Sequence, residues 1–330
     1  MIKKIQQDFS YYSHEFKDNY RKGVHRLRTI LASRAQAQAF VSNAGGTAVV
    51  LGYEPSAPDK NAQELYALLA ASPYIDDAVQ TFLGSIYEAG AESQDAMYSD
   101  SARCLEILHD PVMSRAAGAG TVSAGKWIAT LAGQSCNLYR DMNAVAASDI
   151  AMTAVAASET AMEAVISGTI ALNAVAASKT AMTAVAANET AMAAVIGNSA
   201  ALNAVVSSQT AMTAIANNKT AITAVEASAV AKNALYNSPL KTSISNIAST
   251  SSWTTRRNGK IWLISFRQTW SSGNTSMQHR STLKDGGTVS CTASQSYNTD
   301  YRIDRFMDSI TNYNSAGGIG NVCTYYFIPC

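Results

Sequence analysis

A repeat of ten residues in the middle of the chain constrains its fold more than any other feature of the sequence. From Ser148 the chain reads Ser-Asp-Ile-Ala-Met-Thr-Ala-Val-Ala-Ala, and related segments follow at steps of ten without a slip of register over about ninety residues. A short period that is kept this strictly is the signature of a repeat architecture. The sequence therefore divides into a region before the repeat, the repeat itself and a region after it.

The first position of each unit carries a residue type that begins helices. Ser, Asn and Gly are preferred at helix N-caps, because a short side-chain oxygen or a bare backbone can satisfy the unpaired N–H groups of the first turn. Pro239 follows the last predicted cap, as a first helical residue can. Each unit is therefore predicted to be about two helical turns restarted by a cap. The predicted helix caps are Ser148, Ser158, Ser178, Asn188, Asn198, Ser208, Asn218, Ser228 and Ser238.

Two apolar positions of each unit, the fifth and the eighth, are predicted to form the core of the repeat. They are three residues apart and therefore share one face of a helix. Ten residues at about 100° each fall about 80° short of three turns, so this stripe would spiral around an unbroken helix. The chain must either supercoil left-handedly or kink at each cap, and both arrangements predict a rod. The predicted core residues are Met152, Val155, Met162, Val165, Leu172, Val175, Met182, Val185, Met192, Val195, Leu202, Val205, Met212 and Ile215.

A single thread of such units is not expected to be stable by itself. Its stripe of Met, Ala and Val is narrow, and short isolated helices are marginal in water. Burial against further copies of the chain is therefore expected, in a parallel homotrimer or, as the weaker alternative, a dimer. Methionine stripes can also serve as binding surfaces, but core packing is the favoured interpretation. The repeat thus predicts an elongated helical shaft over residues 141–245, formed as a trimeric bundle.

The region before the repeat, residues 1–140, is predicted to be a helical attachment region. Aromatic and charged residues recur there at helical spacing. Residues 118–133 are rich in glycine and are predicted to form a loop or hinge before the shaft. Their glycines do not have the spacing of a nucleotide-binding motif.

The region after the repeat, residues 246–330, is predicted to be a small antiparallel β domain that forms a tip. Residues 260–270 alternate in character, with Trp262, Ile264 and Phe266 on one face. The other signals are turns at 271–274 and 284–287 and strands at 288–292 and 321–328. The fold class expected for the whole chain is multidomain α plus β, with a helical N-terminal part, a helical shaft and a β tip.

The sequence offers no constellation of residues that would support an enzyme. The four histidines are scattered, and none has a second histidine or a cysteine three or four residues away. No Cys-x-x-Cys pair indicates a zinc site, and no Gly-x-Ser-x-Gly motif indicates a nucleophile. We therefore predict no catalytic residue, no metal site and no cofactor.

Two sets of residues in the β domain permit more than one interpretation. Three cysteines could hold one disulfide or be small buried residues, and burial is favoured. Three aspartates recur at steps of four and could form a carboxylate cluster. They alternate with arginines, so a solvated, ion-paired face of a helix is the favoured interpretation. The residues concerned are Cys291, Cys323 and Cys330, and Asp300, Asp304 and Asp308.

The β domain also contains the residue types of recognition surfaces. Aromatic side chains in loops stack on sugars or anchor protein epitopes. The alternative is that these residues complete a small core. The candidate receptor-binding residues are Trp253, Arg256, Arg257, Trp270, His279, Tyr297, Tyr301 and Tyr313.

Composition excludes two functional classes. The net charge of +1 does not provide the positive surface of a dedicated nucleic-acid binder. No run approaches the roughly 18 to 20 apolar residues of a membrane span, and no apolar segment follows the first lysines, so no secretory signal is expected. The chain is 47% hydrophobic but only 8% aromatic, because the repeat supplies Ala, Val and Met.

The order of a helical N-terminal part, a short-repeat shaft and a β tip resembles bacteriophage tail fibre proteins. Residues 178–185, which read Ser-Lys-Thr-Ala-Met-Thr-Ala-Val, are similar to the short repeats of fibre-type proteins of tailed phages. Residues 145–238 carry most of the resemblance. It implies a virion protein whose N-terminal part binds the tail or baseplate, whose copies form trimers, and whose tip contacts a host glycan or outer-membrane protein.

Two alternatives to this function stay open at the level of the sequence. The chain could be a baseplate-associated connector that binds no receptor, with its β domain docked on another virion protein. It could also be a bacterial surface adhesin, which the missing signal peptide and membrane anchor disfavour. The expected location is the exposed tail or baseplate of the virion after assembly in the host cytoplasm, and no nucleic-acid partner is expected.

Overall fold

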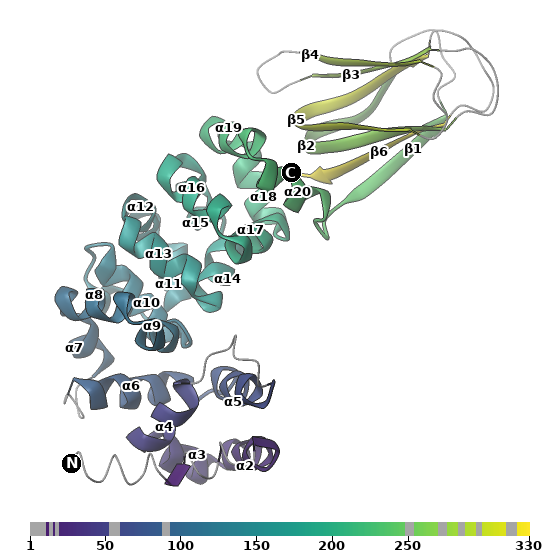
Figure 1. The fold of residues 1–330 in the computed structure, drawn as a ribbon. Coiled ribbons are helices and arrows are strands. Elements are labelled where there is room, and N and C mark those ends of the chain that lie inside the picture. The colour runs from purple at the N-terminus through teal and green to yellow at the C-terminus, as the bar shows by residue number, and fades with distance from the viewer. Residues whose placement is uncertain are drawn as a thin grey trace. The chain divides into compact units, whose positions relative to one another are not determined.

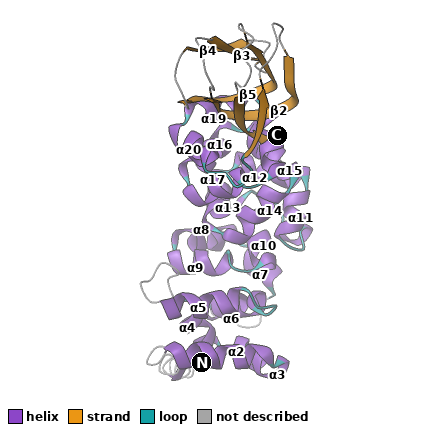
Figure 2. Cartoon of the chain, turned by 90° about the vertical axis from the view of Figure 1, so that its right-hand side faces the viewer, coloured by secondary structure: helices purple, strands orange, loops and turns teal. Residues whose placement is uncertain are grey.

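The structure of the chain is a computed structural model in which two compact units, Met1–Val175 and Ala176–Cys330, are described separately (Figure 1). The residues that it describes are 11–12, 16, 20–52, 60–87, 93–247, 254–269, 276–282, 288–294, 299–314 and 322–330. The chain is mostly helical with an antiparallel sheet at its C-terminal end, so the expected α plus β class is confirmed. Figure 2 shows the strands as one group that follows the last helix in the chain.

The first unit is built from short helices. They are α2 (Tyr20–Ala32), α3 (Arg34–Val41), α4 (Ala44–Leu51), α5 (Lys60–Ala70), α6 (Ile75–Ile86), α7 (Gln94–Tyr98), α8 (Ser101–His109), α9 (Pro111–Ala117), α10 (Thr121–Leu131), the 3-10 helix η1 (Cys136–Leu138), α11 (Met142–Ala147), α12 (Asp149–Ala157) and α13 (Glu159–Ser167). Helix α14 (Thr169–Ala177) contains the division between the units.

The second unit contains the rest of the repeat and the sheet. Its helices are α15 (Lys179–Ala187), α16 (Glu189–Gly197), α17 (Ser199–Val206), α18 (Gln209–Ala216), α19 (Lys219–Ala227) and α20 (Ala229–Tyr236). Its strands are β1 (Thr242–Ile247), β2 (Thr254–Thr269), β3 (Ser276–Thr282), β4 (Thr288–Ser294), β5 (Thr299–Asn314) and β6 (Val322–Pro329).

Each helix from α12 to α20 begins ten residues after the previous one, directly behind a cap residue in extended conformation. Ser148 Oγ accepts a hydrogen bond from the Ala151 N–H at 3.2 Å, and Asn188 Oδ1 accepts one from the Ala191 N–H at 3.0 Å. The same bond is made by Ser158, Ser178, Asn198, Ser208, Asn218 and Ser228. An extended residue between two helices turns the chain sharply, and α12 and α13 differ in direction by 100°. The repeat is therefore kinked at its caps.

Ser238 is the exception among the predicted caps. It is followed by a turn, and β1 begins at Thr242, so no helix has room to form. The Ser238 Oγ accepts a hydrogen bond from the Leu240 N–H at 3.1 Å within that turn. The prediction of a helix cap at this position is wrong, although the hydroxyl keeps the acceptor role of a cap.

In the second unit, helices three places apart in the chain stack on one another. Helix α18 packs on α15, α19 on α16 and α20 on α17, so three helices form one turn of a coil. The cap hydroxyls link successive turns: Ser208 Oγ donates to the Ala176 carbonyl and Ser238 Oγ donates to the Val206 carbonyl, each at 2.5 Å. One serine thus satisfies an N–H of its own helix and a C-terminal carbonyl of the turn below.

The first unit uses the same arrangement. Helix α13 packs on α10, and its cap Ser158 donates a hydrogen bond to the Leu131 carbonyl at 3.1 Å. Helices α8, α9 and α10 follow Asp100, Asp110 and Gly120, which are also ten residues apart. Helices at ten-residue spacing therefore occur before the segment in which the sequence makes the repeat obvious.

All fourteen predicted core residues are buried within one chain, none with more than 8% of its surface exposed. The premise that the stripe needs a second copy in order to be buried is therefore wrong, because stacking in turns of three buries it within one chain. A further position, which was not among the predicted core residues, is fully buried in each of these units. It is the fourth, occupied by Ala151, Ala161, Ala171, Ala181, Ala191, Ala201, Ala211, Ala221 and Ala231.

The expected loop or hinge at residues 118–133 is also wrong, since most of it forms helix α10. Gly120 precedes this helix, and Asp76 supplies the missing cap: its Oδ1 accepts from the N–H groups of Val122 at 3.1 Å and Ser123 at 2.9 Å. A Cβ on Gly120 would lie 2.1 Å from that carboxylate oxygen, which explains the glycine. Trp127 of α10 is fully buried.

The six strands that the structure describes form one sheet in the order β1-β6-β2-β5-β3-β4. Strand β2 covers residues 260–269 of the predicted segment, but a bulge between Leu263 and Ser265 interrupts its alternation. Phe266 consequently packs with Ile261 and Leu263 in the sheet's apolar cluster, while Trp262 lies on the opposite face. The prediction that Trp262, Ile264 and Phe266 share one face is wrong for this reason.

Strand β5 occupies the segment that we interpreted as a helical face. Asp300, Asp304 and Asp308 lie on this strand, and a step of four residues returns to one side of a regular strand just as it does for a helix. The spacing therefore could not distinguish the two, and the helical interpretation is wrong. The predicted strands at 288–292 and 321–328 correspond to β4 and β6, whereas the two predicted turns lie outside the described residues.

The double role of the cap serines can be tested by replacing Ser208 with alanine. The variant loses the hydrogen bonds to Ala211 and to Ala176 of the preceding turn, so we expect it to lose about 1–2 kcal/mol of stability. The neighbouring exposed Ser207→Ala variant should change stability by less than about 0.5 kcal/mol. Equal midpoints of thermal unfolding for the two variants would contradict the role assigned to Ser208.

Candidate functional site

Of the eight candidate receptor-binding residues, the structure describes the side-chain burial of only Arg256 and Arg257. Trp253, Trp270 and Tyr297 lie outside the described residues. The backbone places His279 on β3 and both Tyr301 and Tyr313 on β5. Register brings two of them near each other, since His279 pairs with Asn312 and Gln278 pairs with Tyr313.

The two candidate arginines, Arg256 and Arg257, lie on β2 and are half-buried. The Arg257 guanidinium lies over the ring of Phe327 of β6, with its carbon 4.6 Å from the ring centre. Such a cation–π contact holds Arg257 against the sheet. Arg257 is therefore in part a structural residue, which agrees with the alternative that some candidates complete the core.

The strand order bears on the cysteines of the β domain. Cys291 on β4 and Cys323 on β6 are separated by β3, β5 and β2, and neighbouring strands are about 4.8 Å apart. A disulfide needs Cα atoms within about 7 Å, so these two cysteines are not placed to form one. Cys330 is a free, half-buried thiol, and burial raises its pKa to about 12.

The most specific polar site in the second unit is the junction between the sheet and the last turn of helices, which we call the cap junction. Helix α18 contacts β2 and β6, and α19 contacts β5. The cap junction consists of Glu226, Lys232, Asn233 and Tyr236 from the helices, and of Arg302, Asp304, Arg305 and Phe306 from β5.

The helix residues of the cap junction are departures from the repeat. The ninth position of each unit is apolar in Ala156, Ile166, Ala176, Ala186, Ile196, Val206 and Ala216, and then becomes Glu226 and Tyr236. The fifth position is Met, Leu or Ile until it becomes Lys232. The repeat therefore changes where the sheet contacts it, and the sequence marks the junction in this way.

A longer period explains the regularity of these positions. Units one turn apart share residues that neighbouring units lack, such as Leu172 and Leu202 at the fifth position, where the intervening units have Met. The sixth position is Asn173, Asn203 and Asn233 in the same units. The full repeat is therefore thirty residues, one turn of three helices. This period is not apparent when each unit is compared only with the next.

Glu226 makes the central polar contacts of the cap junction. One carboxylate oxygen accepts from the backbone N–H of Phe306 at 3.0 Å, and the other accepts from the Arg305 guanidinium at 2.6 Å. Its side chain is only 15% exposed, whereas that of Arg305 is 50% exposed. The bond to the backbone therefore contributes more than the partly solvated ion pair.

A second set of contacts surrounds Arg302. Its guanidinium donates to the Asn233 side-chain oxygen at 3.1 Å, forms an ion pair with Asp304, and lies 5.2 Å from the centre of the Tyr236 ring. Lys241 lies over the same ring at 4.4 Å. The aromatic ring at the ninth position of the last unit is thus flanked by two cations, which attract the ring face.

Asp304 is the strained residue of the cap junction. Its φ is +51°, it lies where β5 bulges against β2, and it is 7% exposed. Aspartate adopts this left-handed conformation more easily than most residues. Its Oδ1 has no hydrogen-bond partner, and burial raises the pKa of its carboxyl although Arg302 and Lys232 oppose this effect.

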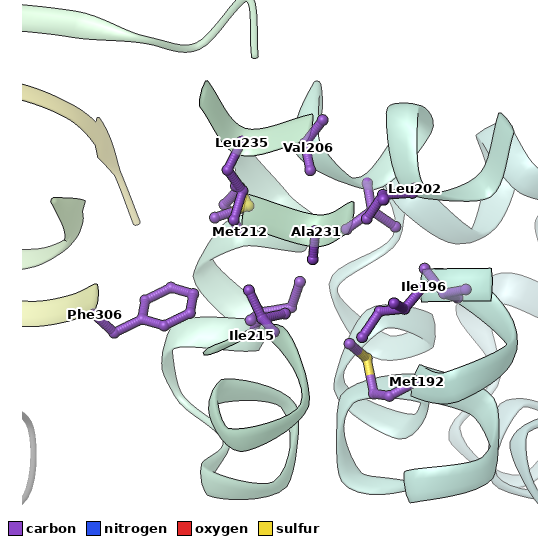
Figure 3. A pocket seen from close by; sticks show the side chains of 12 residues that line it. Met192, Ile196, Leu202, Val206, Met212, Ile215, Ala231, Leu235 and Phe306 are labelled. Atoms are coloured by element: carbon purple, nitrogen blue, oxygen red, sulfur yellow. The ribbon is translucent and has the colours of Figure 1, made fainter. Parts of the chain in front are cut away.

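Beneath these polar contacts the helices and the sheet share an apolar core (Figure 3). Phe306 points from β5 towards Met212, Ile215 and Leu235, and its ring packs edge-on against Trp262 with centres 4.8 Å apart. The cavity that these side chains line leaves about 10 Å³ for the centre of a water molecule. This space is too small and too apolar for a ligand, so it belongs to the core.

The described part of the chain gives no sign of a metal centre or a membrane span. It contains no group of three or more His, Cys, Asp or Glu side chains that could hold a metal ion. None of its helices is by itself long and apolar enough to cross a membrane, and two sharply bent helix pairs reach the required length and composition only when taken together. No protein-family model matches the chain, and no curated protein matches it.

The contribution of Glu226 to the stability of the sheet can be measured with two variants. Glu226→Ala restores the small apolar residue of the repeat but leaves the Phe306 N–H and Arg305 without their acceptor, so we expect the sheet to be destabilised by about 2 kcal/mol. Glu226→Gln keeps an oxygen for the N–H and should lose less than about 1 kcal/mol. Hydrogen exchange rates of the β5 amides measure the stability loss in each variant. A glutamine variant as unstable as the alanine variant would show that the ion pair dominates.

The buried carboxyl of Asp304 predicts a pH dependence. Because its pKa is raised in the folded chain, the folded state binds a proton more tightly, and the native chain should gain stability from this group as the pH falls from neutral towards 4. The Asp304→Asn variant can keep the left-handed backbone conformation, but its side-chain amide does not titrate. Thermal midpoints should show the variant at least as stable as the native chain at pH 7, with this advantage shrinking by pH 4. An advantage that grows on acidification would contradict the assignment.

Proposed function

We propose that the chain is a non-enzymatic structural protein of a bacteriophage virion, a tail fibre. In this proposal its N-terminal part attaches to the tail or baseplate, and its C-terminal β domain recognises a glycan or an outer-membrane protein on the host surface. The protein acts at the exposed tail or baseplate after assembly in the host cytoplasm. It needs no cofactor and no nucleic-acid partner.

The observation that carries the proposal is the cap junction. The apolar pattern of the repeat is interrupted at Glu226, Lys232 and Tyr236. Glu226 and Tyr236 contact β5, and the charge of Lys232 acts on Asp304 of the same strand. A chain that uses several polar contacts to fix a β domain on a stack of helices holds that domain in a defined orientation. Recognition surfaces benefit from such rigid support, because less conformational freedom is lost on binding.

Self-association is part of the proposal, but burial of the repeat core does not require it. The Met and Val stripe, whose burial is the physical reason for a homotrimer, is buried within one chain. A trimer, or the dimer that was the weaker alternative, would have to form through another surface. The core of the repeat cannot be its interface.

The baseplate connector is the second candidate, since a rigidly held β domain could equally dock on another virion protein. The two functions differ in what the β domain binds. A surface adhesin is a weaker third candidate, because the residues described do not favour it over the other two.

The full-length chain should bind host cells and block adsorption of the virus that carries it. Fluorescent full-length protein is mixed with host cells, and both cell-bound fluorescence and protection from infection are measured. Glu226→Ala, which loosens the β domain, should weaken binding by several fold, whereas Glu163→Ala at an exposed helix position should not. Binding to purified tails without binding to cells would favour the connector, and binding to neither would contradict the proposal.

A further inference from the structure

The outer strands of the sheet differ from those at its centre. Helices contact β2, β5 and β6, whereas β3 and β4 lie on the side of the sheet away from β1, and β4 is the edge (Figure 1). An edge strand offers one row of backbone N–H and C=O groups for pairing with another chain. Natural proteins usually protect such edges with lysine, proline, a bulge or a very short strand.

Within its described residues, strand β4 has none of these protections. It reads Thr-Val-Ser-Cys-Thr-Ala-Ser from Thr288 to Ser294, with no charged residue and no proline. It pairs with β3 over all seven residues without a shift of register, so it contains no bulge. Its backbone is therefore regular enough to accept a further antiparallel strand.

The sequence of β4 is complementary to itself when read in the opposite direction. About Cys291 as the centre, Ser290 meets Thr292 of a second copy, Val289 meets Ala293, and Thr288 meets Ser294. Hydroxyl residues thus pair with hydroxyl residues and apolar residues with apolar residues, while Cys291 meets Cys291. Such matched cross-strand pairs stabilise antiparallel sheets, and no like charges oppose each other.

The other edge, β1, is less suited to a second copy. It is joined to helix α20 by only a short turn, and its Ile244 packs against the sheet's own apolar cluster. Ser245 of β1 is already hydrogen-bonded to Thr324 of β6 at 2.8 Å between the two hydroxyl oxygens. The edge at β4 is farther along the sheet from the helices and is the better place for a second chain.

We propose that two copies of the chain associate edge to edge through β4, as an antiparallel strand pair with a two-fold axis at Cys291. The two sheets then form one continuous sheet of twelve strands, since each contributes six. The interface is isologous, because the same strand serves on both sides. The proposal does not rest on the tail-fibre function, and its test requires no host cell.

A thiol pair at the two-fold axis provides the first test. The full-length Cys323→Ser/Cys330→Ser variant keeps Cys291 as the cysteine of the sheet. Mild oxidation with diamide should join two chains: two thiols lose two electrons and two protons to diamide, which is reduced to the hydrazine, and one disulfide forms. Mass spectrometry should identify the Cys291–Cys291 peptide. Crosslinked dimers that lack this peptide, or no crosslink at a concentration where dimers sediment, would overturn the proposal.

Charge substitution provides the second test, by sedimentation of chains with intact cysteines. Ser290→Lys/Thr292→Lys places lysines opposite lysines across the axis and should raise the dimer dissociation constant at least about tenfold. Ser290→Glu/Thr292→Glu should do the same alone. An equimolar mixture of the two variants should restore association, because each lysine then meets a glutamate.

The matched control is Ser243→Lys/Ser245→Lys on the opposite edge, which should leave dimers unchanged. Circular dichroism and thermal midpoints establish that every variant is folded. A monomeric native chain at tens of micromolar overturns the proposal. So does a trimer that survives the β4 lysines, or association that fails only in the β1 variant.

Discussion

The fold of the repeat depends on one arrangement: within each unit, a short helix of eight or nine residues is buried by the helix three places further along the chain. A narrow stripe of Met and Val cannot be buried within a helix of two turns, so the residues of one turn must pack against those of the next. The caps make this possible because they turn the chain sharply every ten residues. Small alanines at the fourth position lie fully buried and let the helices approach.

The cap serines show how one polar group can do two tasks. A helix leaves unpaired N–H groups at its start and unpaired carbonyls at its end. Ser158 and Ser208 satisfy both kinds at once, because a hydroxyl can accept and donate. Asparagine at the same position provides an acceptor of similar reach, as Asn188 does for Ala191. The residue types that mark the repeat in the sequence are therefore those that the geometry requires.

Local chemistry could be predicted from the sequence, whereas arrangement in space could not. The caps and the buried Met and Val positions follow from helix propensity and spacing. The strands after residue 260 follow from the alternation of residue types. The partner of the stripe did not follow, because a stripe reveals that it is buried but not by which segment. Aspartates at steps of four suit both helix and strand, and for this reason the helical interpretation of β5 was wrong.

Long-range contacts account for the other errors. Gly120 indicated a loop, because the residue that caps helix α10, Asp76, is distant in the sequence. Of the candidate receptor-binding residues, Arg257 packs on Phe327, a contact that the sequence does not reveal. The cap junction is marked in the sequence by polar residues at apolar positions of the repeat, but this becomes clear only when units thirty residues apart are aligned.

The thirty-residue turn has a consequence for how such a chain can change in length. Removing a single ten-residue unit from the second unit would rotate every later helix to the next of the three faces, and the residues that meet β5 would arrive on the wrong face. Removing residues 178–207 would instead delete one complete turn and return Glu226 and Tyr236 to the face that they occupy now. The helical stack can therefore change in length only by whole turns. Natural or engineered variants that keep the terminal sheet in place should differ in chain length by multiples of thirty residues.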